Sequence, residues 1–131
     1  MTVFQVDGGK LKEIQEVPAI PTDFTGRNAT AEIQIDRKGR FVYVSNRGHD
    51  SIAVFSVDQN TGFLTPVQHA STQGKTPRNF SLDPTGEYLF AANQNSDTVV
   101  QFKVDPTSGK LTPTGQPIQV PRPVCVLFVK M

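Results

Sequence analysis

One long segment of this chain occurs twice. The segment Asp36–Pro66 aligns without a gap with Asp83–Pro113, so the second copy begins 47 residues after the first. The residues that recur at this offset include the pairs Gly39/Gly86, Asn46/Asn93, Asp50/Asp97, Phe55/Phe102 and Asp58/Asp105. A period of roughly 40–50 residues, carried by short β-type segments, is typical of a propeller blade or of another stacked repeat.

Partial copies of the same segment lie at both ends of the chain. Val3–Asp7 is similar to Val54–Asp58, and Pro121–Val126 is similar to Pro77–Leu82. The sequence therefore predicts two complete repeat units with incomplete units on either side.

Each complete copy predicts four strands, because four segments rich in β-branched and aromatic residues are separated by turn residues. In the first copy these segments are Ala31–Ile35, Phe41–Ser45, Ile52–Val57 and Leu64–Gln68. No segment shows helical periodicity with caps. The predicted fold class is all-β: a β-propeller fragment with two full four-stranded antiparallel blades and parts of the flanking blades.

The repeat also predicts boundaries along the chain. Residues 1–17 supply the third and fourth strands of one blade, residues 31–68 and 78–118 form the complete blades, and residues 124–129 supply the first strand of a closing blade. This arrangement amounts to fewer than three blades, whereas a closed propeller has typically four to eight.

Composition excludes several functional classes. The 131 residues are 37% apolar and 19% charged, which is ordinary for one globular domain, and a net charge of +1 gives no electrostatic argument for nucleic acid or an anionic membrane. No apolar run reaches the ~20 residues that span a bilayer, and no secretory signal is visible, so we expect a cytoplasmic protein. We expect Cys125 to be a packed free thiol, since it lies in an apolar run. The two histidines and the one cysteine do not have the spacing of zinc ligands. We expect neither a metal nor a cofactor.

The antiparallel order predicts where a site would lie. Loops between the second and third strands share one face with the connections from one blade to the next, and the tight turns share the other face. Binding residues concentrate in irregular loops on a rigid scaffold, so we expect the site on the face of the irregular loops. These loops are Val17–Thr30, Asn46–Ser51, Gln68–Arg78 and Asn93–Asp97.

A family resemblance rests on the segments Ala31–Ile33 and Asp36–Ile52, of which Asn46–Ile52 is the most specific part. It continues through Pro77–Phe80 and Ala92–Asp97. These segments closely resemble the seven-bladed β-propeller lactonase family of bacterial 6-phosphogluconolactonases, whose members are more than twice as long. The resemblance implies the C-terminal third of such a hydrolase, acting on 6-phospho-glucono-1,5-lactone in carbohydrate metabolism.

The resemblance also implies an incomplete site. In the family the central pocket is lined in addition by an upstream Pro-Arg-His segment and a later Asn-Glu pair. Here Pro77-Arg78 is followed by Asn79, and Asn93 is followed by Gln94. We therefore expect weak or no lactonase activity from the chain alone.

Three residues are candidate catalytic groups. Arg47 follows the second strand and Glu32 opens the first strand, so both lie at the same end of one blade. A guanidinium there can bind phosphate or stabilise the oxyanion of an opening lactone, although a structural ion pair with Glu32 is the alternative. His49 can act as a general base, although the neighbouring Asp50 recurs as Asp97 and favours a loop-fixing role for this loop.

Four further residues are candidate substrate ligands. Arg78 and Arg122 each follow a proline near the start of a first strand, where their charge can attract a phosphorylated sugar lactone. Asn93 and Gln94 correspond to Asn46 and Arg47, and their amides can bind sugar hydroxyls. Turn geometry explains the asparagine equally well.

Two other functions stay open at this point. The chain can be a non-catalytic propeller module for binding or structure, or a relative that lactonises a muconate-type acid, since arginine serves a carboxylate as well as a phosphate. The predicted partner is a small phosphorylated sugar lactone, with no nucleic acid and no membrane. Open blade edges at both ends also predict a homo-oligomer.

Overall fold

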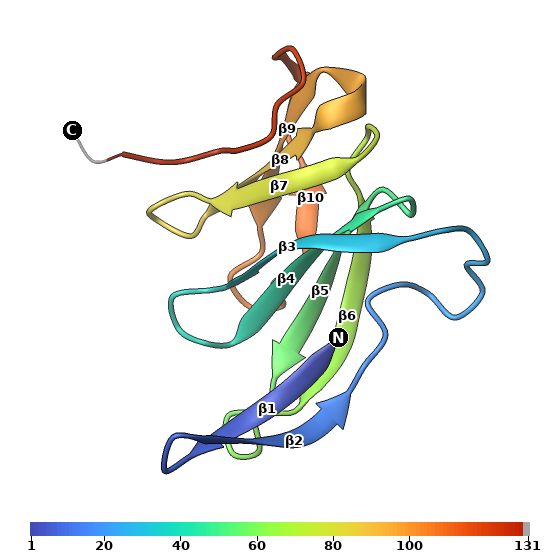
Figure 1. Ribbon diagram of the computed structural model, residues 1–131. Coiled ribbons are helices and arrows are strands. Elements are labelled where there is room, and N and C mark those ends of the chain that lie inside the picture. The colour runs from blue at the N-terminus through green and yellow to red at the C-terminus, as the bar shows by residue number, and fades with distance from the viewer. Residues whose placement is uncertain (130–131) are drawn as a thin grey trace.

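The computed structural model describes residues 1–129, which form three antiparallel sheets in chain order (Figure 1). The first sheet pairs β1 with β2, and the second has the order β3-β4-β5-β6. Their bounds are β1 Thr2–Asp7, β2 Lys10–Glu16, β3 Ala29–Ile35, β4 Phe41–Arg47, β5 Ser51–Val57 and β6 Leu64–Ser71.

The third sheet repeats the second but has a broken outer strand. It has the order β7-β8-β9-β10, and the short β11 also pairs with β9 beyond β10. Its strands are β7 Pro77–Leu82, β8 Tyr88–Asn93, β9 Thr98–Val104, β10 Leu111–Pro113 and β11 Ile118–Gln119, and a short 3-10 helix, η1, covers Gln94–Ser96. The predicted all-β propeller fragment with two four-strand repeats is confirmed. Across residues 1–129, no helix is both long and apolar enough to cross a membrane.

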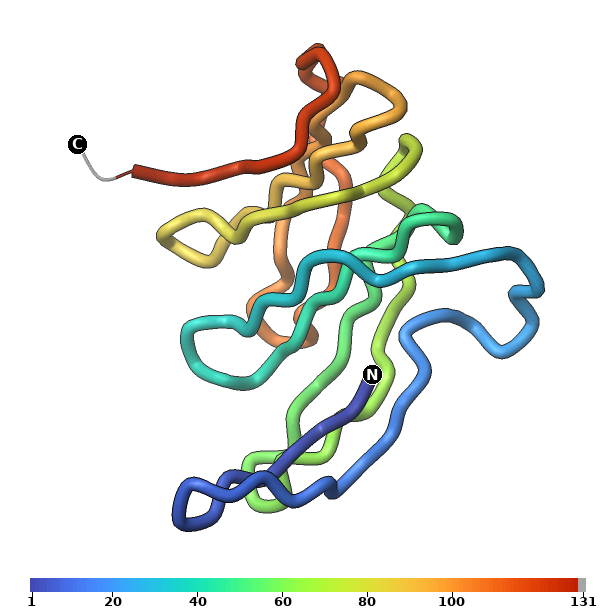
Figure 2. The backbone as a smooth tube through the Cα atoms, viewed as in Figure 1, coloured from blue at the N-terminus to red at the C-terminus, as the bar shows by residue number. Residues whose placement is uncertain are grey.

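The C-terminal segment differs from its prediction. Residues 124–129, predicted as a first strand, form no strand, and Cys125, predicted as a packed thiol, is exposed. Residues 124–129 run beside β7 (Figure 2). The Val126 N–H donates to Asn79 Oδ1 over 2.8 Å. A first strand pairs along its length with the second strand of its own blade, and residues 124–129 have no such partner strand among residues 1–129.

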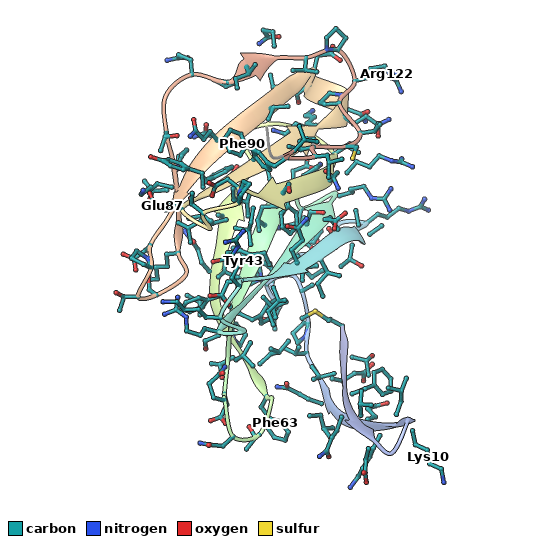
Figure 3. The ribbon with its side chains drawn as sticks, turned by 90° about the vertical axis from the view of Figure 1, so that its left-hand side faces the viewer. Lys10, Tyr43, Phe63, Glu87, Phe90 and Arg122 are labelled. Atoms are coloured by element: carbon teal, nitrogen blue, oxygen red, sulfur yellow. The ribbon has the colours of Figure 1, made fainter. Side chains whose placement is uncertain are left out.

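Alternation along β4 builds two cores between the three sheets. Phe41 and Tyr43 pack toward the third sheet, whereas Val42 and Val44 pack toward the first. Tyr43 lies buried between sheets (Figure 3), and its hydroxyl donates to the Gly109 carbonyl over 3.1 Å. Burial, with Asp36 nearby, raises the pKa of this hydroxyl well above its usual range. A period-two strand buried on both faces is what a middle blade requires.

Glutamine side chains join each sheet to the next. The Gln15 amide donates to the Leu64 carbonyl over 2.8 Å and accepts from the Leu64 N–H over 2.7 Å. The Gln68 amide makes the same pair with Leu111, over 3.1 and 2.8 Å. Because Leu64 and Leu111 are 47 residues apart, this amide clamp is a property of the repeat.

The strand directions give the molecule two different faces. The turns 36–40, 58–63, 83–87 and 105–110 form a turn face, and in Figure 3 Glu87 marks one of its turns and Phe63, at the bottom of the picture, marks another. The connections 17–28 and 72–76, the loop 48–50 and the helix η1 form a loop face, on the right in Figure 1. All candidate site residues lie at or near the loop face.

Candidate functional site

Two buried asparagines hold the loop face together. The Asn46 Nδ2 group donates to the Ala19 carbonyl over 2.7 Å, and the Asn93 Nδ2 group donates to the Thr72 carbonyl over 2.8 Å. Both side chains are 0% exposed. The Asn93 amide, a predicted substrate ligand, is therefore engaged in holding a connection, and its Oδ1 atom is buried with no partner among residues 1–129.

Two aspartates in left-handed backbone conformation fix the connections that follow them. Asp50 and Asp97 have φ values of 54° and 55°. Asp50 Oδ1 accepts from the Thr76 N–H over 2.9 Å, and Asp97 Oδ1 accepts from the Arg122 N–H over 2.8 Å. The predicted loop-fixing role of this aspartate is confirmed. Arg122 is thus the counterpart of Thr76 rather than of Arg78, and its side chain is exposed.

The connection 17–28 is locked onto the loop 48–50. Asn28 Nδ2 donates to Asn46 Oδ1 over 3.0 Å, and Asn28 Oδ1 accepts from the His49 N–H over 3.1 Å. Gly48 has a φ of 118°, and a Cβ there would lie 2.0 Å from the Arg27 carbonyl oxygen. Only glycine permits this approach, so the backbone beside Arg47 is held rigidly.

Arg47 ends β4 at the loop face, opposite Ala29 in the register. Its Nη2 group donates to the Thr30 carbonyl over 3.4 Å, and its Nε atom is buried with no hydrogen-bond partner in the described chain. The alternative of a structural ion pair with Glu32 is wrong: no Arg47–Glu32 pair lies within 4.0 Å. The ion pairs found within residues 1–129 are Arg40–Asp36 and Lys103–Glu87. The guanidinium thus keeps donors for an anionic ligand.

Glu32 lies in an irregularity of β3. The register passes from Thr30/Asn46 to Ile33/Val44, so Glu32 lies opposite Ser45, two residues before Arg47 on the neighbouring strand. Its N–H donates to Ser45 Oγ over 3.0 Å. The half-buried carboxylate accepts at Oε2 from Asn79 Nδ2, over 2.7 Å. Glu32 and Arg47 therefore lie at the same end of one blade, as predicted.

Asn79 is the site residue that sequence reasoning missed. It lies on β7 at the position of Glu32 on β3, since the two residues are 47 apart. The first strands β3 and β7 lie side by side (Figure 1). The 47-residue offset could have indicated the contact between Asn79 and Glu32, because equivalent residues on adjacent first strands are neighbours in a stacked repeat.

His49 belongs to a separate cluster. Its Nδ1 atom lies 2.7 Å from Ser51 Oγ, and its ring meets the rings of Phe24 and His69 edge-on, with centroids 4.9 and 5.9 Å apart. Burial, and then the neighbouring His49, lower the pKa of His69. In the described chain no hydrogen bond joins His49 to Arg47 or Glu32, and none joins Arg47 to Glu32, so the three candidate catalytic residues are not linked to one another directly.

Two predicted ligands lie at the loop end of the third sheet. Arg78 is exposed on β7, where the register shifts between Pro77 and Asn79. Gln94 opens η1, and its N–H donates to the Thr76 carbonyl over 3.0 Å. Arg78 therefore adds an exposed positive charge next to Asn79.

Two hollows lie away from these residues. One of about 320 Å³ opens on the turn face between the second and third sheets, where its lining includes Tyr43, Glu87 and Lys103. Another of about 290 Å³ lies between β1 and β3 and is lined mainly by apolar side chains. Both arise where sheets diverge, and neither contains a candidate site residue. Within residues 1–129, no three His, Cys, Asp or Glu side chains gather as a possible metal site.

Residues 1–128 match the family model described as "Lactonase, 7-bladed beta-propeller". The chain is 48% identical over 121 residues to the 6-phosphogluconolactonase of Bacillus subtilis, covering 92% of this chain and 35% of that protein.

Solved structures have the same fold. A protein from Lactobacillus plantarum superposes with a TM-score of 0.94 at 40% identity, and the Pseudomonas aeruginosa periplasmic gluconolactonase with a TM-score of 0.92 at 35% identity. The superpositions cover 98% of this chain but only 38% and 36% of those chains. The chain thus spans about a third of the length of these relatives. It belongs to the seven-bladed β-propeller lactonase family.

Proposed function

We propose that this chain is part of a lactonase that hydrolyses 6-phospho-glucono-1,5-lactone to 6-phosphogluconate. The observation that carries the proposal is the Arg47 guanidinium at the loop face, which within residues 1–129 has no ion pair with Glu32 and makes one side-chain hydrogen bond, from Nη2 to the Thr30 carbonyl. The similarity to a protein named 6-phosphogluconolactonase supports the choice of substrate. Arg78, Gln94 and Arg122 would bind the phosphate and hydroxyl groups.

The proposed reaction needs a proton acceptor and an oxyanion partner. Water adds to the lactone carbonyl carbon while Glu32 accepts a proton from it, and Arg47 donates to the oxygen that gains negative charge. The bond from the carbonyl carbon to the ring oxygen then breaks. The ring oxygen takes that proton from Glu32 and becomes a hydroxyl, and the new carboxylic acid ionises. His49, held on Ser51 in a separate cluster, stays a predicted second base.

A non-catalytic binding module is the second candidate. It is favoured by one observation: the chain spans 35% of the Bacillus subtilis relative, so residues of a complete pocket can lie outside it. Removing one member of a catalytic set commonly costs several orders of magnitude in rate. Both candidates predict binding at Arg47, and they differ in turnover.

Hydrolysis measured beside the full-length Bacillus subtilis protein separates the two candidates. We expect the 131-residue chain to release acid from the phosphorylated lactone at a rate lower by several orders of magnitude. Turnover matching the longer relative, and lost on Arg47→Ala, would contradict an incomplete site. Such a result would mean that the chain assembles a full pocket.

Location and assembly are part of the same proposal. A phosphorylated sugar does not cross membranes freely, so an enzyme using one is expected in the cytoplasm, although the Pseudomonas aeruginosa relative is named periplasmic. Open sheet edges favour a homo-oligomer. Localisation by fractionation of cells that express the chain natively would test the first point.

A further inference from the structure

Asn79 joins three parts of the molecule at the candidate site. Its Nδ2 group donates to Glu32 Oε2 over 2.7 Å, and its Oδ1 atom accepts from the Val126 N–H over 2.8 Å. The side chain is half-buried on β7. One amide therefore connects β3, β7 and the C-terminal segment 124–129.

The chemistry of the two partners fixes the orientation of this amide. A backbone N–H only donates, so Val126 must meet the amide oxygen. An ionised carboxylate only accepts, so Glu32 must meet the amide nitrogen. Turning the amide over would place donor against donor and acceptor against acceptor. An asparagine satisfies both partners, and an aspartate could not donate to Glu32 without a shared proton.

The contact with Asn79 leaves one oxygen of the Glu32 carboxylate available as an acceptor. Asn79 binds Oε2, and no hydrogen bond occupies Oε1 in the part of the chain that the structure describes. The Glu32 N–H is held independently by Ser45 Oγ over 3.0 Å. Backbone and side chain are thus restrained from two different strands, and Oε1 remains as an acceptor for a reacting water.

We infer that Asn79 is a positioning residue that holds the Glu32 carboxylate in one rotamer with Oε1 available to the reaction. The inference rests on the proposed function for the use made of Oε1. The restraint itself is a physical property of the chain that does not depend on turnover. The inference also predicts that the C-terminal segment is hydrogen-bonded to Asn79 but is not needed to hold Glu32.

Side-chain couplings of Glu32 measured by NMR test the restraint in the full 131-residue chain. We expect a single rotamer in the wild type and rotamer-averaged couplings in Asn79→Ala, which loses both contacts. The matched control is Val126→Pro, which removes the Val126 N–H and leaves the Asn79 side chain in place, so Glu32 should keep its single rotamer. Asn79→Ser, too short to reach Glu32, repeats the test if the alanine variant is poorly folded.

Two outcomes would overturn the inference. One is a Glu32 side chain that is averaged in the wild type or stays fixed in Asn79→Ala and Asn79→Ser. The other is averaging in Val126→Pro as large as in Asn79→Ala, which would assign the restraint to the C-terminal segment. Binding of 6-phosphogluconate to the wild type is measured on the same samples. Absence of binding with a fixed Glu32 would contradict the proposed function and leave the positioning role standing.

Discussion

At the scale of single residues, the repeat separates structural from candidate functional positions. Positions that are identical in both copies hold loops, because every blade needs the same bonds to its neighbour. Positions that differ between copies are free from this requirement and carry the candidate chemistry. The identical pairs are Asn46/Asn93 and Asp50/Asp97, and the differing pairs are Glu32/Asn79, Arg47/Gln94 and His49/Ser96.

The lowered pKa of His69 leads to the prediction that the stability of the folded chain depends on pH. Burial and His49 lower the pKa of His69 in the folded chain, so below roughly 6.5 the unfolded chain binds more protons at this residue. The free energy of unfolding should therefore fall as the pH drops through this value. Urea unfolding at pH 7.5 and 5.5 should show a smaller loss in His69→Gln than in the wild type. Equal losses in the two proteins would assign the effect to other groups.

Sequence reasoning at this scale succeeded where local chemistry decides the structure. The Asp50 and Asp97 bonds were predictable, since an aspartate repeated in a short loop satisfies nearby backbone N–H groups. The absence of a Glu32–Arg47 ion pair was not, because side-chain direction depends on the irregularity in β3 and on Asn79 from another blade. Strand alternation gives the end of the blade at which a residue lies, but not its partner.

At the scale of elements, the chain is a series of sheets joined by amide clamps. The strands of the two complete repeats were predictable from hydrophobic alternation and turn residues. Two departures lie toward the C-terminal end. The outer strand of the third sheet is divided into β10 and β11, and residues 124–129 have no second strand to pair with among the described residues. Pairing depends on the partner, which a segment's own residues do not reveal.

The Gln68 clamp should contribute measurably to stability. Gln68→Ala removes both bonds to Leu111, a buried residue whose N–H and carbonyl groups then lose their side-chain partner. Leaving such groups unpaired costs about 1–3 kcal/mol. The exposed Gln119 is the control, and Gln119→Ala should stay within about 0.5 kcal/mol. Urea denaturation gives both values, and equal values would mean that the clamp is not stabilising.

At the scale of the whole molecule, apolar surface is exposed beside the two-stranded first sheet and in the C-terminal segment. Ile33 is 56% exposed beside the hollow between β1 and β3, and Leu127 is 79% exposed in the C-terminal segment. In a complete propeller such surfaces are covered by neighbouring blades. The family match and the superpositions describe such propellers, of which this chain represents about a third of the length.

The exposed ends predict self-association of the isolated chain. Residues 124–129 of one copy can cover the hollow beside β3 of another, which would bury Ile33 and Leu127 together. Sedimentation velocity should show a homo-oligomer that Ile33→Lys disperses, while Ile118→Lys, also exposed but on β11, leaves it intact. A monomeric wild type at high micromolar concentration would contradict this assembly.

If Arg47 belongs to a site for a phosphorylated sugar acid or its lactone, the chain must bind such a compound at the loop face. Titration of the chain with 6-phosphogluconate, followed by NMR, should shift signals of the loop face around Arg47 and Arg78. We expect Arg47→Ala to weaken this binding about tenfold or more, which corresponds to about 1.4 kcal/mol for the loss of a charge-assisted contact. The control Arg37→Ala, on the turn face, should bind like the wild type. Signals that shift on the turn face instead, or equal affinity in Arg47→Ala and the wild type, would contradict the account.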